Sequence, residues 1–229
     1  MPPTLQTIFC ENFETFAQSR SLPPPIHKAA RALMQCRTAE LGGHVQKCPD
    51  GHVERIWYNS CKHRCGPQCA EIHRERWLQS TKERLLACEH YQVIFTIPHE
   101  LHEVWLLNPA VMPSLLFRSV RDTLIGLLAD PRYLGALPGL LSSLHTWGQT
   151  LILHPHLHCL VTAGGWTEEG VWRPVSKGYL LPVKMVKVVY RGKLLDAIGT
   201  ALDRGELQLP AQQSVSQLRS LLNKLGRKK

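Results

Sequence analysis

The sequence has no run of uncharged apolar residues long enough to cross a membrane. Its first residues, Met1-Pro-Pro-Thr-Leu-Gln, lack the basic start and the apolar run of a secretory signal peptide. It also contains no internal repeat and no low-complexity tract. These absences predict a cytoplasmic protein, in which the eight cysteines would be thiolates or metal ligands rather than disulfides.

The length and the charge of the chain set limits on its class. Its 229 residues suffice for one large domain or two modest ones with a sizeable core. The net charge of +9 is unevenly distributed, because residues 173–229 contain 12 Lys and Arg against 3 Asp and Glu. Such a basic segment favours a polyanion, for which nucleic acid is the default partner. A basic surface that is merely solvated is the alternative.

Two histidines flank one apolar residue in the segment His154-Pro-His156-Leu-His158. The stretch around them, residues 151–161, is short and apolar and is followed by Gly164-Gly165, which predicts a buried strand. Residues two apart share a face of a strand, so His156 and His158 would point the same way and could hold one metal ion. The alternative is a pair of hydrogen-bonded histidines on a half-buried strand without a metal.

Residues 144–151 are predicted to form the preceding strand of a hairpin. If Gln149 lies opposite His156, the face of the histidines also carries His145, Trp147 and Gln149. Gln149 or a nearby carboxylate would then complete a site for a divalent ion, with Mg²⁺, Mn²⁺ and Zn²⁺ all open. Such an ion would polarise a phosphodiester as a Lewis acid.

A second group of metal-binding residue types lies between residues 36 and 69, where five cysteines and three histidines occur. Two short segments, Cys48-Pro-Asp-Gly-His52 and Cys65-Gly-Pro-Gln-Cys69, have the spacing of tight turns joined by a ribbon. Such turns can present four ligands tetrahedrally to one Zn²⁺. The first-choice ligands are Cys48, His52, Cys65 and Cys69, with Cys61, Cys36 and His44 in reserve. The alternative, a helix of core cysteines, conflicts with Gly66 and Pro67.

The rest of the pattern predicts an α+β protein. Helices are expected at residues 5–18, 26–36, 68–88, 113–128 and 182–202 and from about residue 214, with a strand at 91–97. Lys184, Lys187 and Arg191 fall on one stripe of the helix at 182–202. A strand, a helix, a hairpin and further helices describe an antiparallel sheet with flanking helices. We expect one domain at residues 1–90 and a second at 91–229.

Several segments resemble, in order, the rolling-circle insertion-sequence transposases of the HUH, two-tyrosine class. They are residues 36–44, 48–52, 57–64, 91–101, 145–149, 154–158 and 181–193. The resemblance covers nearly the whole chain. It implies a zinc-binding DNA-recognition domain at 1–90 and an HUH nuclease domain at 91–229, with catalytic Mg²⁺ or Mn²⁺ held by His156, His158 and Gln149. Such enzymes nick single-stranded or hairpin DNA with a tyrosine, which implies DNA as the partner and a place at the bacterial nucleoid.

The sequence departs from that family at two places. The second cysteine turn of the family reads Cys-Pro-x-Cys, which puts a cysteine where this chain has Gly66, so that Cys65 would be the substitute. The nucleophilic tyrosines of the family lie downstream of every matched segment. Tyr179 and Tyr190 precede that position, and no two tyrosines of the chain fall on adjacent helical turns. The nuclease domain is therefore expected to be incomplete at its C-terminus and catalytically impaired.

Three hypotheses follow. The first is a truncated transposase, which could associate with a full-length copy. The second is a DNA-binding module without chemistry that uses the zinc domain and the basic helix with Lys184, Lys187 and Arg191. The third is a metal-dependent hydrolase that uses water as its nucleophile.

Overall fold

The computed structural model describes residues 3–20, 22, 24–150, 152–176 and 178–227. The chain forms two compact units, residues 1–85 and 86–229, and each is described by itself. The domain boundary that we expected after residue 90 falls close to this division. Within the described residues, no helix combines the length and the apolar character that a membrane crossing requires.

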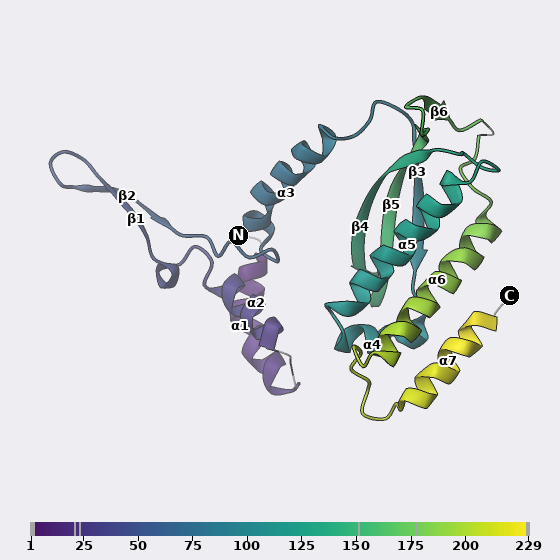
Figure 1. The fold of residues 1–229 in the computed structure, drawn as a ribbon. Helices are drawn as coiled ribbons and strands as arrows, with labels where there is room; N and C mark the ends of the chain where they lie inside the picture. Colours follow the sequence, from purple (N-terminus) through teal and green to yellow (C-terminus); the bar gives the residue numbers. More distant parts are fainter. Residues whose placement is uncertain (1–2, 21, 23, 151, 177, 228–229) are drawn as a thin grey trace. The chain divides into compact units, whose positions relative to one another are not determined.

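Two helices open the first unit, α1 (Leu5–Gln18) and α2 (Pro24–Met34) (Figure 1). The side chain of Thr4 caps α1 by accepting a hydrogen bond from the backbone N–H of Thr7 at 3.1 Å. Phe13 stacks on Phe9 at 5.9 Å and meets the ring of His27 edge-on at 5.7 Å, which packs α1 against α2. The helix predicted at residues 5–18 is confirmed.

A two-stranded ribbon follows the short 3-10 helix η1 (Ala39–Leu41). Its strands β1 (Gly43–Lys47) and β2 (Val53–Tyr58) are antiparallel, and all their residues are exposed. Gly43 is required where the strands pair, because a Cβ there would collide with the carbonyl oxygen of Trp57. The unit ends with α3 (Pro67–Lys82), which is six residues shorter at its C-terminus than predicted.

The second unit is built on an antiparallel sheet with the strand order β3-β5-β4. Its strands are β3 (His90–Thr96), β4 (Leu137–Trp147) and β5 (Leu153–Trp166), and the short β6 (Trp172–Pro174) pairs with the end of β5. The α+β class predicted from the sequence is confirmed. Leu151, which was expected in the histidine strand, lies outside the described residues.

Helices cover one face of this sheet (Figure 1). The 3-10 helix η2 (His99–Leu101) and α4 (His102–Leu107) lead into α5 (Val111–Ala129), and α6 (Val183–Asp203) and α7 (Val215–Arg227) follow the sheet. Leu157, Cys159 and Val161 of β5 are completely buried, as predicted, in one core with the inner faces of α5, α6 and α7. The histidine face of the sheet is the opposite one, because residues alternate along β5.

The expected ends of two strands were wrong. β4 begins at Leu137, seven residues earlier than predicted, and β5 continues through Gly164 and Gly165. These glycines do not end the strand but allow close packing, since a Cβ on Gly165 would come within 2.6 Å of the carbonyl oxygen of Leu137. The helix α4 was not predicted at all, because six residues are too few to show helical periodicity.

Candidate metal centres

Three histidines on two neighbouring strands form the first candidate centre, the histidine group: His145, His156 and His158. The strand register places His145 of β4 directly opposite His156 of β5. One ring nitrogen from each histidine lies within 4.8 Å of those of the other two, and the Nε2 atoms of His156 and His158 are 3.1 Å apart. The alternation of a strand brings His156 and His158 together, as the sequence predicted.

Hydrogen bonds orient two of these rings. Nδ1 of His156 lies 2.5 Å from the carbonyl oxygen of His154, and since a carbonyl only accepts, Nδ1 carries the proton and Nε2 keeps its lone pair. Nδ1 of His158 lies 2.8 Å from the side-chain amide of Gln92 on β3. The two ends of that amide are interchangeable, so its oxygen can accept from a protonated Nδ1. Both Nε2 atoms can then face one ion.

The electrostatics also favour ligation. Burial lowers the pKa of His158 below its usual value, and the neighbouring His145 and His156 lower it further. A lowered pKa favours the neutral imidazole, which is the form that binds metals. His156 is only 8% exposed, whereas His145 lies at the surface. The group can therefore hold a divalent ion with three nitrogens and leave coordination positions open on the side of His145.

The predicted register of the hairpin was wrong. Gln149 does not lie opposite His156 but in the turn between β4 and β5, where the N–H of Gly148 donates to the carbonyl of Ile152 at 3.0 Å. A register irregularity also separates the His145 and Trp147 pairs. His145, and not Gln149, lies opposite His156. The signal that could have found it is Gly148, which marks the turn.

The surroundings of Tyr190 indicate whether this tyrosine could act as a nucleophile. It lies on α6 and packs edge-on against Phe95 at 4.9 Å, and its hydroxyl donates to the carbonyl of Thr96 at 2.9 Å. Phe95 belongs to the core, so this ring lies on the helix side of the sheet. Burial strongly raises the pKa of Tyr190, which disfavours the phenolate.

Three cysteines from separate segments form the second candidate centre, the thiol group: Cys36, Cys61 and Cys69. Cys36 follows α2, Cys61 follows β2, and Cys69 lies in the first turn of α3. The sulfurs lie within 4.8 Å of one another, and those of Cys36 and Cys69 are 3.2 Å apart. Three thiolates at this separation fit a tetrahedral Zn²⁺.

The backbone around the thiol group has two residues with positive φ angles, and some of its N–H groups donate to the sulfurs. Arg37 and Lys62, which directly follow two of these cysteines, have positive φ angles of 58° and 51°. Such a conformation costs roughly 1–2 kcal/mol per residue. Backbone N–H groups point at the sulfurs: that of Cys61 donates to Cys36 Sγ, and that of His63 to Cys61 Sγ, both at 3.4 Å. Amide donors of this kind stabilise thiolates, which supports a metal-binding role.

The pKa values of Cys36 and Cys69 shift in opposite directions. Burial raises the pKa of Cys36 to about 11. Burial would raise that of Cys69 too, but hydrogen bonds from Cys36, Cys61 and Ser60 outweigh it and lower the pKa. Cys69 therefore becomes a thiolate more readily than Cys36. A metal ion would replace these shared protons.

The structure does not assemble the first-choice zinc ligands in one place. Cys48 and His52 lie at the tip of the ribbon, with Sγ and Nδ1 3.4 Å apart, and Asp50 completes a separate group of possible ligands there. Of the first-choice set, Cys69 belongs to the thiol group, whereas Cys65 is exposed and outside it. The reserve candidates Cys61 and Cys36 belong to the thiol group.

Another reserve candidate, His44, pairs with Trp57 within the ribbon and lies outside both groups. The structure separates these residues. Sequence spacing shows which residues share a turn. It does not show which turns meet in space.

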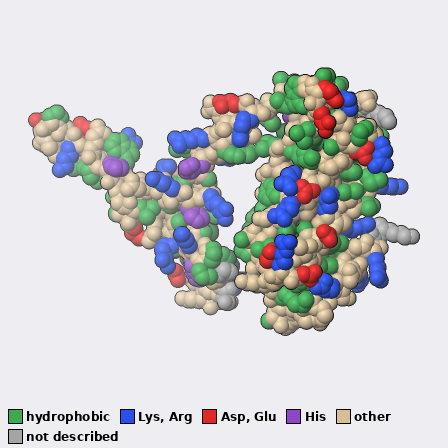
Figure 2. All heavy atoms as spheres, in the orientation of Figure 1, with side chains coloured by type: hydrophobic (Ala, Val, Ile, Leu, Met, Phe, Trp, Pro, Cys, Tyr) green, Lys and Arg blue, Asp and Glu red, His purple; other side chains and the backbone are tan. Residues whose placement is uncertain are grey.

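The basic residues predicted to contact DNA lie near the start of α6. Lys184 and Lys187 are exposed, and Arg191 is half-buried. On the face of the molecule shown in Figure 2, basic side chains are interspersed with acidic ones and do not form one patch. The stripe on α6 is the candidate DNA contact that the sequence predicted in this unit.

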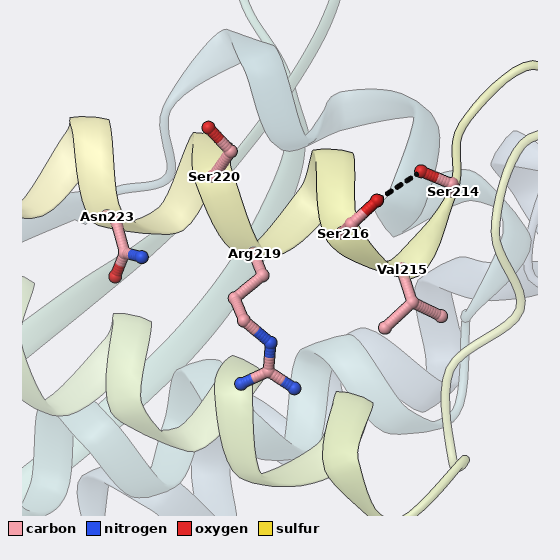
Figure 3. Close-up of a pocket in the computed structure, with 6 residues that line it drawn as sticks. All are labelled: Ser214, Val215, Ser216, Arg219, Ser220 and Asn223. Atoms are coloured by element: carbon pink, nitrogen blue, oxygen red, sulfur yellow. Dashed lines mark hydrogen bonds between the residues drawn. The ribbon is translucent and has the colours of Figure 1, made fainter.

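A shallow hollow beside α7 offers no comparable chemistry (Figure 3). It is lined by residues 214–216, 219, 220 and 223, all from this helix and its N-terminal end. Its charged residue, Arg219, is paired with Asp203. The metal centres therefore remain the functional candidates.

Two family models match the chain. Residues 8–97 match the model described as a transposase zinc-binding domain, and residues 139–229 match the one described as a putative transposase. The first match contains the thiol group and the ribbon. The second contains the histidine group and α6.

Two curated relatives are similar to the chain. It is 39% identical over 208 residues to the putative transposase y4qJ of Sinorhizobium fredii, a match that covers 90% of this chain and 52% of the relative. It is 34% identical over 146 residues to the transposase for insertion sequence element IS801 of Pseudomonas savastanoi pv. phaseolicola, covering 63% of this chain and 35% of the relative. The chain thus spans about half the length of the first relative and about a third of the second.

The solved structures with a similar fold include the conjugative relaxase TrwC. In its complex with a 27-mer DNA, the TM-score is 0.38 and the identity 14%, with 54% of this chain and 48% of TrwC covered. In its metal-bound complex with oriT DNA, the TM-score is 0.36 and the identity 14%, with 60% of this chain and 64% of TrwC covered.

Proposed function

The chain belongs to the IS91-type family of transposases with an N-terminal zinc-binding domain, and from that premise we propose that it acts on single-stranded or hairpin DNA at the ends of an insertion sequence. In this proposal residues 1–90 recognise the DNA and residues 91–229 hold its scissile phosphodiester. The protein would associate with a full-length transposase that is bound to the same DNA ends. Since that DNA is bacterial, we place the protein at the nucleoid in the cytoplasm.

The histidine group is the observation that carries this proposal. His145, His156 and His158 would hold a divalent ion, with His145 as third ligand in place of Gln149. Such an ion supplies Lewis-acid polarisation of a phosphodiester oxygen. Three imidazole nitrogens favour Mn²⁺ or Zn²⁺ over Mg²⁺, which prefers oxygen ligands. Gln92 and the carbonyl of His154 would keep the ligand rings in orientation.

Strand transfer through a covalent intermediate also requires a nucleophile. A tyrosyl oxygen would form an ester with the phosphate and thereby retain the energy of the broken bond. The hydroxyl of Tyr190 is engaged with the carbonyl of Thr96, and its raised pKa opposes the phenolate that would attack. We therefore propose that these 229 residues bind and polarise DNA but form no covalent adduct with it.

A native gel, which reports binding, and a denaturing gel, which reports a covalent link, together test this proposal. Labelled single-stranded DNA from an insertion-sequence end, incubated with the protein and Mn²⁺, should bind without migrating with the denatured protein. The variant His156→Ala/His158→Ala should lose the part of the binding that depends on Mn²⁺. A covalent adduct that disappears in Tyr190→Phe or Tyr179→Phe would identify the nucleophile that we exclude.

A DNA-binding module without chemistry is the second candidate, and the ribbon supports it. Trp57 and Tyr58 are 42% and 44% exposed, and the guanidinium of Arg55 lies 5.0 Å from the centre of the Trp57 ring. Exposed aromatic rings with a cation beside them suit stacking on bases next to a phosphate. If Trp57→Ala abolishes DNA binding while His156→Ala/His158→Ala changes nothing, the module is the correct function.

A further inference from the structure

The thiol group provides three corners of a tetrahedron. With Zn–S bonds of about 2.3 Å, the sulfurs of a tetrahedral zinc centre lie roughly 3.8 Å apart. The sulfurs of Cys36, Cys61 and Cys69 satisfy this within the adjustment that metal binding allows, since all lie within 4.8 Å of one another. Among the described histidines, cysteines and carboxylates, none adds a fourth donor to the group within that distance.

Gly66 lies beside the thiol group. A Cβ built on this buried glycine would lie 3.4 Å from Cys61 Sγ, 3.4 Å from the Cβ of Cys69 and 3.3 Å from the carbonyl oxygen of His63. Its direction is therefore toward the thiol group. The backbone of Gly66 has φ −79° and ψ 114°, which any L-residue adopts. The glycine is not required by the backbone, and its effect is to leave the corner without a side chain.

Two further candidate ligands, His63 and Cys65, lie between Cys61 and Cys69 in the sequence. Cys65 is exposed, and its backbone N–H donates to Nδ1 of His63 at 3.2 Å. The backbone N–H of His63 in turn donates to Cys61 Sγ, which fixes the His63 main chain beside the group. Turning Nδ1 of His63 toward the thiol group would break its hydrogen bond with the backbone N–H of Cys65, and the sulfur of Cys65 belongs to none of the groups of possible ligands.

We propose that the zinc centre of this protein has three cysteine ligands and that its fourth ligand is an exchangeable water molecule in the space beside Gly66. The inference rests on the proposed zinc domain and deepens it. Structural zinc sites are almost always closed by four protein ligands, and an open position is typical of sites at which ligands exchange. The centre therefore releases zinc to a competing chelator more readily than a four-cysteine centre does.

Adding a fourth thiolate tests whether the fourth coordination position of the zinc ion is open to water. Gly66→Cys should tighten zinc binding at least about tenfold, because it adds a thiolate at the vacant position. Gly66→Ala adds the Cβ without the sulfur and should give no gain. Gly192→Cys adds a thiol on exposed helix α6, where nothing lies within 4 Å of the Cβ, and should leave zinc affinity unchanged. Affinity is measured by competition with a chromophoric chelator.

Cobalt substitution reports the ligands directly. A background of Cys48→Ser and His156→Ala removes the other candidate centres, so that Co²⁺ is expected at the thiol group. Thiolate-to-cobalt charge transfer should be stronger in Gly66→Cys than in the unsubstituted background. The Co²⁺ electron paramagnetic resonance lines should broaden in water enriched in the magnetic oxygen isotope, and Gly66→Cys should abolish this broadening.

Three outcomes would overturn the inference. If Cys65→Ser weakens the charge transfer, Cys65 is a fourth ligand; if His63→Ala shifts the cobalt spectrum, His63 is. In both cases the zinc domain stands and the open corner fails. If Co²⁺ binds with no isotope broadening and Gly66→Cys does not bind zinc more tightly, the corner is closed by another group. A protein that binds neither zinc nor cobalt would instead refute the zinc domain itself.

Discussion

The histidine group and the thiol group are both sets of three metal-binding side chains, but they are held in place differently. His145, His156 and His158 stand on adjacent strands of a sheet whose other face belongs to a core of 24 buried residues. In the first unit, by contrast, the buried apolar residues are Phe13, Ala30, Leu33 and Cys69 among those described. One of these four is itself a member of the thiol group.

This difference assigns the metals different structural roles. The sheet positions the histidines without an ion, since its hydrogen bonds and its core do not depend on one. Cys36, Cys61 and Cys69 come from three segments, of which the first two are also joined by a hydrogen bond from the backbone N–H of Arg37 to the carbonyl of Asn59 at 3.0 Å. In the proposed function, an ion at the thiol group would therefore contribute to folding and an ion at the histidine group to chemistry.

Metal removal is expected to have the largest effect. A strong chelator should unfold the first unit and leave the second folded, because only the first depends on its ion for cohesion. Limited proteolysis should then cut within residues 1–85 and spare residues 86–229. Protection of both units after complete loss of zinc would show that the two centres do not differ in this way.

Cysteine replacement sharpens the same test. Cys69→Ser should lower the zinc content and expose residues 1–85 to protease, because it removes one thiol of the thiol group, whose pKa is lowered by its neighbours. Cys88→Ser is the matched control, because Cys88 is half-buried but belongs to neither group. Equal zinc loss in the two variants would contradict the assignment of the thiol group.

Replacing histidines should separate chemistry from folding. His156→Ala/His158→Ala is expected to weaken Mn²⁺ binding more than about a hundredfold, since two of three ligands are lost. The zinc content and the protease resistance of the protein should not change. Gln149→Ala, in the turn, should alter Mn²⁺ affinity less than about threefold. Titration calorimetry measures the Mn²⁺ affinity of the unaltered protein and both variants. A large loss of affinity in Gln149→Ala would show that Gln149 is a ligand after all.

The histidine group and the thiol group also differ in how much of each could be predicted from the sequence. The shared face of His156 and His158 depends only on the alternation of a strand, and the buried face with Leu157 follows from the same rule. The third histidine depends on where the chain turns and on an irregularity of register after His145, neither of which alternation reveals. His145 was placed on the correct face, but its partner across the hairpin was predicted wrongly.

Which cysteines form the thiol group was harder to predict from the sequence. The clustering of cysteines predicted a zinc site, and the match to a transposase zinc-binding domain agrees with that prediction. The ligand set depends on contacts between residues as far apart as 36 and 69 and on positive φ angles at Arg37 and Lys62, which are neither glycine nor asparagine. Local spacing therefore selected Cys48 and His52, which share a turn, over Cys36 and Cys61, which do not.

Replacing the basic stripe of α6 should have an intermediate effect. If Lys184, Lys187 and Arg191 contact phosphates, their joint replacement by alanine should lower the slope of log affinity against log salt by up to about three. Binding should weaken for every DNA sequence alike, because phosphate contacts carry no sequence information. Measurements of single-stranded DNA binding by anisotropy at several salt concentrations provide the slope. An unchanged slope would move the DNA path to the ribbon, for which Arg55→Ala is the companion variant.

The smallest predicted effect concerns Gln92, which links the histidine group to a third strand. Its side-chain amide contacts Nδ1 of His158 at 2.8 Å and fixes that ring, so Gln92→Ala should weaken Mn²⁺ binding by roughly tenfold. Gln92→Glu should retain most of the affinity, because a carboxylate accepts the same hydrogen bond and makes the imidazole a better ligand. Both variants should fold normally, since Gln92 is exposed. Titration calorimetry with Mn²⁺ distinguishes the cases: if Gln92→Ala binds as tightly as the unaltered protein, the sheet alone orients His158.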